Sequence, residues 1–504
     1  MSWWPYVACL LSIFIAGKFL EYRTNSRKLS NLRGLRSIFS PASPFGTLIP
    51  TCSWNPGLGW QWQWRNQVYS KYGLQTMSVM AYLSGRPAIY TISMDVARQI
   101  LSVKGQFKKP ELTTLLMKLW GPNIFTENGA EWSRHRRIMN PAFTPETNAF
   151  VWDEAANLYQ QMIENEGWVH QDDLKIPAIN GVTSKFALIL IARCGFGQSI
   201  SWETKSPGSG MLFGEALLIV SRSSIVRLIT PRWMYKLPIQ RLHQIESAYS
   251  SLGILMKELI STRREELALE EEDSAHKQKD VFRLLLRASQ GQGKLQMSDD
   301  ELVGNTFLML FAGHETTARA LDAAIGFLAL YEDIQEEVFQ EIRSVMSLDG
   351  KLAFEHYSRL TKVQSAFLEA SRLFPAVMMI FRETTDIVTL KTDEEDGHGG
   401  QVTLGPGTWV AVDVPGIHYS PRYFPAPEDF RPSRWYGVSE SDMTMFSLGP
   451  RSCVAFLSNL LCDWKLQIVL KPGETRPQWR ARVMRGASAM TLGVGEVPVR
   501  LTRR

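Results

Sequence analysis

The stretch that decides the fold lies near the C-terminus and reads Phe446-Ser-Leu-Gly449-Pro-Arg451-Ser-Cys453. It places one thiol at the end of a glycine-containing loop, with a cation two residues before it. A lone cysteine is more often a buried, inert residue than a ligand. In this stretch, however, Gly449 permits a tight backbone, Arg451 favours a thiolate, and the ring of Phe446 can shield the sulfur. The pattern therefore favours a functional thiolate over an inert core cysteine.

The order Phe-x-x-Gly-x-Arg-x-Cys resembles the cysteine loop of the cytochromes P450, and the chain as a whole resembles a microsomal, fungal-type member of that family. The resemblance implies a haem cofactor with Cys453 as the axial ligand of its iron. It also implies that Phe446, Gly449 and Arg451 surround the cofactor.

The residues after Cys453 depart from the family pattern. A glycine is expected two residues later, but Ala455 stands there, and the pair Asp463-Trp464 comes too early. Aligning that pair with the family leaves roughly ten residues absent, about three helical turns. The N-terminal end of that helix normally helps to stabilise the thiolate. We expect Cys453 to ligate iron with lowered haem affinity, and the sequence leaves open a genuine deletion or an error at an exon junction.

Length and composition indicate one large globular body. The chain has 504 residues, of which 45% are hydrophobic and 21% charged, and it shows no internal repeat. The formal charge of +5 comes from scattered basic residues, so nucleic-acid binding has little support. Five widely spaced cysteines without a C-x-x-C pattern indicate neither a disulfide framework nor a zinc site. A reducing compartment fits this cysteine content.

The N-terminus predicts a membrane anchor. Residues from Trp3 to Leu20 are almost wholly apolar, which is long enough to span a bilayer with slight extension. A secretory signal is the alternative, but a basic start and a small-residue cleavage site are missing. Basic residues from Arg23 to Arg36 follow, so the positive-inside rule keeps the body in the cytosol. We expect a single-pass anchor over 1–21 in the endoplasmic reticulum membrane.

The remaining chain divides into a linker and a catalytic domain. Residues 22–60 are basic and then rich in proline and glycine, which predicts a stiff linker. Residues 61–504 form the expected cytochrome P450 catalytic domain. The fold class is mainly α with a minor β region, because apolar periodicity is helical over most of the middle. The predicted elements are a Trp-rich helix over 61–73, helices across 132–379, and strands at 89–92, 387–390 and 402–404.

A second motif reads Phe311-Ala312-Gly313-His314-Glu315-Thr316-Thr317-Ala318 within an apolar helical stretch. The Thr316 hydroxyl can bond the carbonyl of Ala312, and Gly313 allows the helix to widen into a wet groove. Polar residues that simply face solvent are the alternative. The order resembles the distal helix of the cytochromes P450 and implies catalytic, proton-relaying roles for Glu315 and Thr316. His314 occupies a position without a family counterpart, and we do not expect it to bind metal.

Glu369 and Arg372 have the three-residue spacing of an ion pair on one helical face. Most such pairs lie on the surface and contribute little, but apolar flanks predict that this one is buried. A buried pair needs a further partner, and the family resemblance implies Arg434. We expect the triad Glu369, Arg372 and Arg434 to be structural and to fix the scaffold around the cysteine loop.

Haem carries two propionates that require cations or N–H donors. Trp132 and Arg136 lie four residues apart and share a helical face. By family position, Arg382 and Arg451 complete the propionate-binding set. Arg134 and Arg137 belong to the solvated face of the same helix in this interpretation.

The chain carries no Walker A loop, no His-Glu-x-x-His and no Gly-x-Gly-x-x-Gly motif in a nucleotide-binding context. Electrons must therefore come from a partner, which the family resemblance identifies as a membrane-bound NADPH-cytochrome P450 reductase. The resemblance implies a haem-thiolate monooxygenase that inserts one atom of O2 into a hydrophobic small molecule. Fungal relatives suggest a terpenoid or another secondary metabolite by analogy. Apolar stretches at 115–120, 211–220 and 377–381 can line a substrate pocket or simply pack in the core.

Three alternatives remain open, of which the limiting case is a chain that retains no haem at all. A haem-thiolate isomerase or dehydratase uses the same loop without a reductase, although the Glu315-Thr316 pair argues against it. The shortened helix after Cys453 gives weight to a catalytically impaired or non-catalytic membrane-anchored haem-binding protein.

Overall fold

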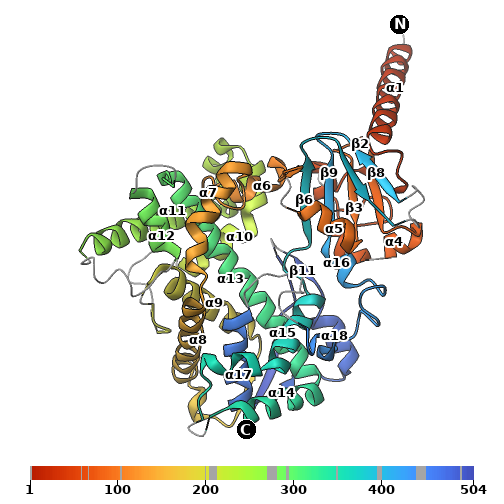
Figure 1. The fold of residues 1–504 in the computed structure, drawn as a ribbon. Helices are drawn as coiled ribbons and strands as arrows, with labels where there is room; N and C mark the ends of the chain where they lie inside the picture. Colours follow the sequence, from red (N-terminus) through yellow and green to blue (C-terminus); the bar gives the residue numbers. More distant parts are fainter. Residues whose placement is uncertain are drawn as a thin grey trace. The chain divides into compact units, whose positions relative to one another are not determined.

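The structure is a computed structural model that describes most of the chain in thirteen stretches: 3–41, 43–57, 59–65, 67–102, 105–198, 200–203, 213–269, 281–290, 295–347, 350–393, 400–438, 450–488 and 491–504. The chain divides into two compact units. The first contains Met1–Thr113 and Val377–Asp429, and the second contains Thr114–Ala376 and Phe430–Arg504. The first holds the largest sheet and the second most of the helices (Figure 1). The prediction of a mainly α protein with a minor β region is confirmed.

The first unit is built on a six-stranded mixed sheet. Strand β9 (Trp409–Asp413), one of its two central strands, is strongly apolar. Its residues Val410, Ala411 and Val412 have no solvent exposure, as expected for a strand covered on both faces. A separate two-stranded ribbon joins β7 (Val388–Lys391) to β8 (Gln401–Leu404), where alternation had predicted strands. In spatial order the large sheet contains β1 (Gly34–Phe39), β2 (Thr76–Ser84), β3 (Ala88–Thr91), β9 (Trp409–Asp413), β6 (Met379–Thr384) and β4 (Phe107–Lys108).

Part of the segment expected to be a linker belongs to this sheet. Strand β1 pairs in parallel with β2, starting at Gly34 opposite Ser78. The guanidinium of Arg36 donates hydrogen bonds to the Ser78 hydroxyl and to the phenol oxygen of Tyr22, each at 3.0 Å. The proline and glycine content of 22–60 had masked this strand, because parallel pairing is non-local and leaves little trace in a short segment.

Helix α1 (Trp4–Lys28) carries the predicted anchor and continues past it. It is the single helix in the described part of the chain that is long and apolar enough to cross a membrane, with a mean hydropathy of 1.3 in its best window. None of its residues is buried. The Trp-rich helix predicted over 61–73 is instead two short helices, α3 (Trp60–Trp64) and α4 (Gln67–Tyr72), because Arg65 has a positive φ of 46°.

The second unit is organised around the long helix α13 (Asp299–Leu330). A capping box between Ser298 and Glu301 starts the helix, and every residue from Leu321 to Leu330 is buried. Gly313 lets α9 (Asn180–Phe196) approach closely, since a Cβ atom at Gly313 would lie 2.8 Å from the side chain of Ile191.

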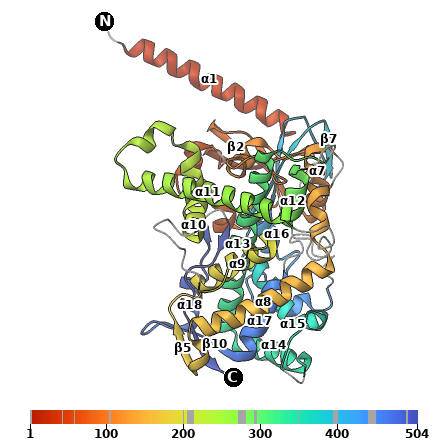
Figure 2. The same cartoon turned by 90° about the vertical axis from the view of Figure 1, so that its left-hand side faces the viewer.

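Other helices of this unit pack around α13 or beside one another. Helices α8 (Pro145–Asn165) and α17 (Pro450–Asp463) lie side by side (Figures 1 and 2). The remaining helices of eight or more residues are α7 (Gly129–Met139), α10 (Phe213–Ile229), α11 (Gln240–Leu269), α12 (Val281–Gln290), α14 (Glu332–Val345), α15 (Thr361–Leu373) and α18 (Arg476–Val483), and helix α6 (Glu111–Lys118) crosses the boundary between the units. The strands are β5 (Asp173–Ile176), β10 (Trp464–Ile468) and β13 (Val499–Arg503) in one sheet, and β11 (Ala487–Ser488) with β12 (Leu492–Gly493) in another.

Candidate functional site

Cys453 lies in the first turn of α17 and is only 1% exposed. It is the fourth residue of that helix, so the thiol sits one turn further along than the loop end expected from sequence. The first amide groups of a helix have no partner within the helix and form its positive end. This position therefore favours negative charge on the sulfur. Two residues predicted to surround the cofactor, Phe446 and Gly449, lie outside the described residues.

Burial alone opposes ionisation of this thiol. Removal from water raises the pKa of Cys453 to about 12, and a bond from the neighbouring Ser452 only partly offsets that effect. A buried thiolate therefore needs a strong cationic partner. The iron of a haem is such a partner, because metal binding displaces the thiol proton. The donor present in α17 thus suits haem iron.

Helix α17 is short but well packed. It has 14 residues and leads directly into β10 at Trp464. The Phe456 ring lies 4.5 Å from the Phe186 ring and 5.8 Å from the Tyr159 ring, measured between centroids. The Tyr159 hydroxyl donates a 2.8 Å hydrogen bond to Asp463, the last residue of the helix. Helix α17 therefore packs firmly in the core, although the family resemblance predicts roughly three further turns after Cys453.

Glu315 is 7% exposed, and both of its carboxylate oxygens accept hydrogen bonds from hydroxyl groups. Ser221 of α10 donates at 2.7 Å, and Thr491, just before β12, donates at 2.8 Å. Neither hydroxyl was predicted from sequence. Each lies more than ninety residues from Glu315 along the chain, so no local spacing points to it.

Thr316 donates a hydrogen bond of 2.5 Å to the carbonyl of Ala312, as its spacing had indicated. The expected widening of the helix is absent, since α13 is α-helical from Asp299 to Leu330. A bond back to the preceding turn is compatible with ordinary α geometry, so it does not by itself open a groove. Ala312 is nevertheless exposed, and Gly313 and Thr316 are half-buried, on a helix that is otherwise mostly buried. This side of α13 is therefore incompletely covered at Ala312, whereas Gly313 packs closely against Ile191 of α9.

His314 is buried, and one ring nitrogen lies 2.9 Å from the Ser184 hydroxyl. Burial lowers the pKa of His314 to about 4, so the ring is neutral near pH 7. Among the described residues, no group of three or more His, Cys, Asp or Glu side chains could hold a metal ion. That His314 binds no metal stays a prediction.

The structure brings Glu369, Arg372 and Arg434 together. The Arg372 guanidinium donates two hydrogen bonds of 2.9 Å to the Glu369 carboxylate, and Arg434 donates one of 3.2 Å. The Glu369 and Arg372 side chains are 0% and 1% exposed. Two further donors were not predicted: the Trp435 indole at 2.9 Å and the backbone N–H of Arg431 at 3.0 Å. Five hydrogen bonds thus compensate one buried carboxylate.

The residues proposed for the propionates lie in both units. In α7 the Arg136 guanidinium carbon lies 5.1 Å from the centre of the half-buried Trp132 ring, so these two side chains share one face. In α17 the Arg451 guanidinium carbon lies 5.6 Å from the Tyr357 ring. Arg382 lies on β6 of the first unit, where burial lowers its pKa.

One expectation for α7 is wrong. Arg134 does not lie on a solvated face: its side chain is 17% exposed and forms an ion pair with Glu301 of α13. The basic run 134–137 had indicated a solvated surface, but Glu301 is distant in sequence and invisible to that pattern.

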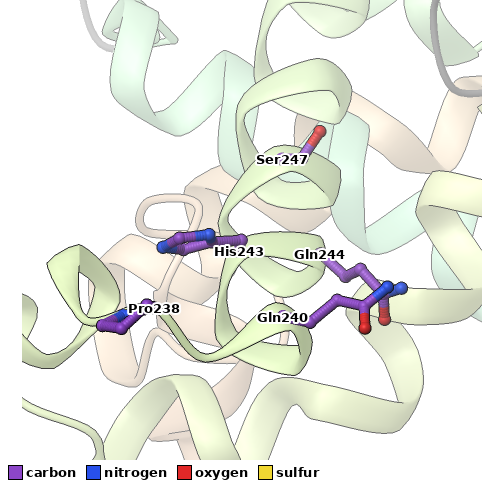
Figure 3. A pocket seen from close by; sticks show the side chains of 5 residues that line it. All are labelled: Pro238, Gln240, His243, Gln244 and Ser247. Carbon is purple, nitrogen blue, oxygen red and sulfur yellow. The ribbon is translucent and has the colours of Figure 1, made fainter.

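A surface hollow of about 490 Å³ lies near the start of α11 and contains none of the predicted site residues (Figure 3). Of the apolar stretches considered for a substrate pocket, Met117, Leu217 and Val220 belong to the hydrophobic core, and Met211 lies outside the described residues. The hollow is lined by Pro238, Gln240, His243, Gln244 and Ser247.

Comparisons with known proteins identify the family. The family model named Cytochrome P450 matches residues 59–454. Cytochrome P450 monooxygenase 124 of Postia placenta is 32% identical over 98% of each chain. Cytochrome P450 monooxygenase prx9 of Penicillium rubens is 28% identical over 76% of this chain and 68% of its own. The crystal structure of the cytochrome P450DA heme domain has a TM-score of 0.69 at 18% identity, and covers 94% of this chain and 98% of its own.

Membership of this family implies a haem cofactor that is ligated by a cysteine. The chain belongs to the cytochrome P450 monooxygenase family.

Proposed function

We propose that this protein is a membrane-anchored haem-thiolate monooxygenase that inserts one oxygen atom from O2 into a hydrophobic small molecule, with electrons from an NADPH-cytochrome P450 reductase. The observation that carries the proposal is the buried Cys453 at the positive end of α17, a helix that packs against α13. Haem, when bound, supplies the oxygen chemistry, and a thiolate ligand favours cleavage of the O–O bond.

We assign roles to the chain's own residues from the family resemblance, and their local contacts support these roles. We assign Cys453 as the iron ligand, and Trp132, Arg136, Arg382 and Arg451 as propionate contacts. The Glu369, Arg372 and Arg434 triad is structural, because it is buried and its polar groups bond to one another.

Proton delivery is assigned to Thr316 and Glu315. The Thr316 hydroxyl carries a proton that it now donates to the Ala312 carbonyl, on the accessible side of α13. Glu315 is the adjacent carboxylate, held by two hydroxyl groups that can each pass a proton to it. General acid–base groups of this kind typically contribute a factor of about 10² to 10⁴ in rate.

The membrane location rests on α1. This helix is exposed along its length, and basic residues occupy its last turn at Arg27 and Lys28. Cationic residues after an apolar span favour the cytosolic side. We therefore propose an endoplasmic reticulum location with the catalytic domain facing the cytosol, where an NADPH-dependent reductase can reach it.

The substrate class is proposed from the relatives. The relatives from Postia placenta and Penicillium rubens are named cytochrome P450 monooxygenases, and another relative, from Leptosphaeria maculans, is named a phomenoic acid biosynthesis cluster cytochrome P450 monooxygenase. We infer that this chain oxidises an apolar fungal secondary metabolite, such as a terpenoid.

The second candidate function is a haem-binding protein with impaired catalysis. The family match ends at residue 454, directly after Cys453. The alignment with the Postia placenta relative spans 516 positions, more than the 504 residues of this chain, so that relative has residues without a counterpart here. Inserting about ten family-like residues after Val454, roughly three helical turns, should then raise haem retention. No gain would count against the idea that the short helix weakens haem binding.

The test of the main proposal is reconstitution of the full chain with an NADPH-cytochrome P450 reductase in membranes. Candidate apolar compounds, terpenoids first, are supplied under 18O2. Incorporation of one labelled atom into a product, lost in the Cys453→Ala variant, is expected. A product formed without NADPH and without label would instead favour an isomerase or dehydratase.

A further inference from the structure

The face of α7 opposite to Trp132 and Arg136 is fixed to α13 by a charged network. Arg134 of α7 donates to both carboxylate oxygens of Glu301, one of them at 3.2 Å, and to the carbonyl of Gln296 at 2.5 Å. Glu301 also accepts from the backbone N–H of Ser298 at 2.8 Å, as part of the capping box that starts α13. Glu301, which caps the start of α13, therefore also binds the middle of α7 through Arg134.

His135 adds a second link beside this ion pair. Its ring is fully buried, with Nε2 at 3.2 Å from Glu301 Oε1 and Nδ1 at 3.2 Å from the Asn305 amide nitrogen. The amide nitrogen of Asn305 can only donate, so Nδ1 accepts and the ring proton lies on Nε2, facing Glu301. The Asn305 oxygen accepts from the backbone N–H of Ile124 at 3.0 Å, which supports this orientation of the amide.

The turn before α7 is held at the same place. A Cβ atom at Gly304 would lie 2.4 Å from the Pro122 carbonyl, and one at Gly121 would lie 2.2 Å from the Asp300 carbonyl, so both glycines are needed for this contact. Asn123 closes the turn by accepting from the backbone N–H groups of Phe125 and Thr126. Three segments, the turn 121–126, α7 and the start of α13, thus meet around Glu301.

The positions of Arg134 and His135 on α7 indicate what their contacts with Glu301 and Asn305 do. Residues four apart share a helical face, whereas residues two apart lie about 200° around the axis. Arg134 therefore lies opposite to Trp132 and Arg136, which remain stacked on each other at 5.1 Å. Arg134 holds the helix from behind and His135 holds it from the side, so together they set the rotation of the face that carries Trp132 and Arg136.

We propose that Arg134, His135, Glu301 and Asn305 are positioning residues, which orient Trp132 and Arg136 toward an anionic group of the cofactor. The inference rests on the proposed function, since it takes the haem propionates as that group. It extends the proposed function because none of these four residues touches the cofactor in this assignment.

The experiment uses the haem-loaded full chain in four forms: the wild type, Arg134→Ala, Glu301→Gln and the control Arg137→Ala. Arg137 lies on the same helix and is exposed, so its removal takes away one positive charge without touching the network. The first readout is the rate of haem transfer to excess apomyoglobin. The second is the frequency of the propionate bending bands in resonance Raman spectra, which reports hydrogen bonding at the propionates. Thermal unfolding of each variant is recorded alongside.

Haem loss should be about tenfold faster in Arg134→Ala and Glu301→Gln than in the wild type, as for loss of a contact worth about 1.4 kcal/mol. The propionate bands should shift in both variants and remain unchanged in Arg137→Ala. The double variant Arg134→Glu with Glu301→Arg should restore slow haem loss, because it rebuilds the ion pair in reverse.

Three results would overturn the inference. Equal haem loss and unshifted propionate bands in the network variants and in Arg137→Ala would show that the network does not position these contacts. Haem loss that follows thermal stability alone, without rescue by the double variant, would show a purely structural role. A wild type that takes up no haem would overturn the proposed function together with the inference, and is distinguished by the missing Soret band before any variant is compared.

Discussion

Arg372 donates two hydrogen bonds to Glu369 from one helical turn away, and both side chains are buried. Arg434 and the Trp435 indole complete the surroundings of this carboxylate from a segment about sixty residues later. Burial of charge without such partners costs several kcal/mol, so the arrangement is stable only as a complete set.

The first prediction concerns the loss of the Glu369 carboxylate from this buried set. Glu369→Ala leaves Arg372 charged and buried, and should lower the free energy of unfolding by about 3–5 kcal/mol. The control is Glu337→Ala, which removes the exposed partner of Lys362 at 3.5 Å and should cost less than about 1 kcal/mol. Chemical denaturation followed by circular dichroism measures both. Equal losses of unfolding free energy in the two variants would show that the buried ion pair stabilises the fold no more than the exposed one.

The hydroxyl pair around Glu315 gives a second prediction. Ser221→Ala combined with Thr491→Val leaves a buried carboxylate without these two donors, and should cost about 1–3 kcal/mol for each bond removed. Ser224→Ala is the matched control, since its hydroxyl bonds only backward to the Val220 carbonyl in the same helix and to Tyr249. Urea denaturation of both proteins tests this. A double variant as stable as the control would contradict the prediction.

Thr316 should matter for coupling rather than for folding. Thr316→Ala removes the hydroxyl beside Ala312, and we expect product formed per NADPH consumed to fall by about tenfold to a hundredfold, with hydrogen peroxide released instead. The unfolding midpoint should stay near that of the wild type, because the side chain is only half-buried. Thr317→Ala, one position further along, serves as the control. Unchanged coupling in Thr316→Ala would remove its assigned role.

The burial of Asp322 leads us to expect that the stability of the folded protein depends on pH. Burial raises the pKa of Asp322 to about 7, despite hydrogen bonds from Thr183 and Asn180. A raised carboxyl pKa means that the folded state keeps a proton which the unfolded state has already lost. The contribution of this group to stability is therefore fully present below pH about 4 and is lost as the pH rises to about 7.

Asp322→Asn should remove that loss. The variant is expected to gain stability relative to the wild type as the pH rises from 4 to 8, measured as the difference between their thermal midpoints at each pH. A constant difference across this range would mean that Asp322 does not titrate between the folded and unfolded states as stated.

Sequence reasoning succeeded where the signal is local or motif-based. The three-residue spacing of Glu369 and Arg372 in an apolar context predicted a buried pair, and the four-residue spacing of Ala312 and Thr316 predicted their hydrogen bond. The mainly α fold followed from periodicity together with the family motifs. These features depend on residues within one helix, where spacing alone determines which side chains meet.

Prediction from the sequence failed where a residue's partner is distant along the chain. Ser221 and Thr491 reach Glu315 from segments that no spacing connects to it, and Glu301 removes Arg134 from the solvated face assigned to it. Strand β1 was hidden in an expected linker because its pairing with β2 is non-local. In each case the tertiary contact outweighs the local composition.

The most direct test of the central claim, that Cys453 provides a thiolate ligand to haem iron, is the carbon monoxide difference spectrum of the reduced, membrane-expressed protein. A Soret band at the long-wavelength position of thiolate-ligated haem, lost in Cys453→Ser, is the result expected here. A band at the shorter wavelength of neutral ligation, or no band at all, would contradict the claim and would mean that the short helix after Cys453 has cost the protein its thiolate or its haem.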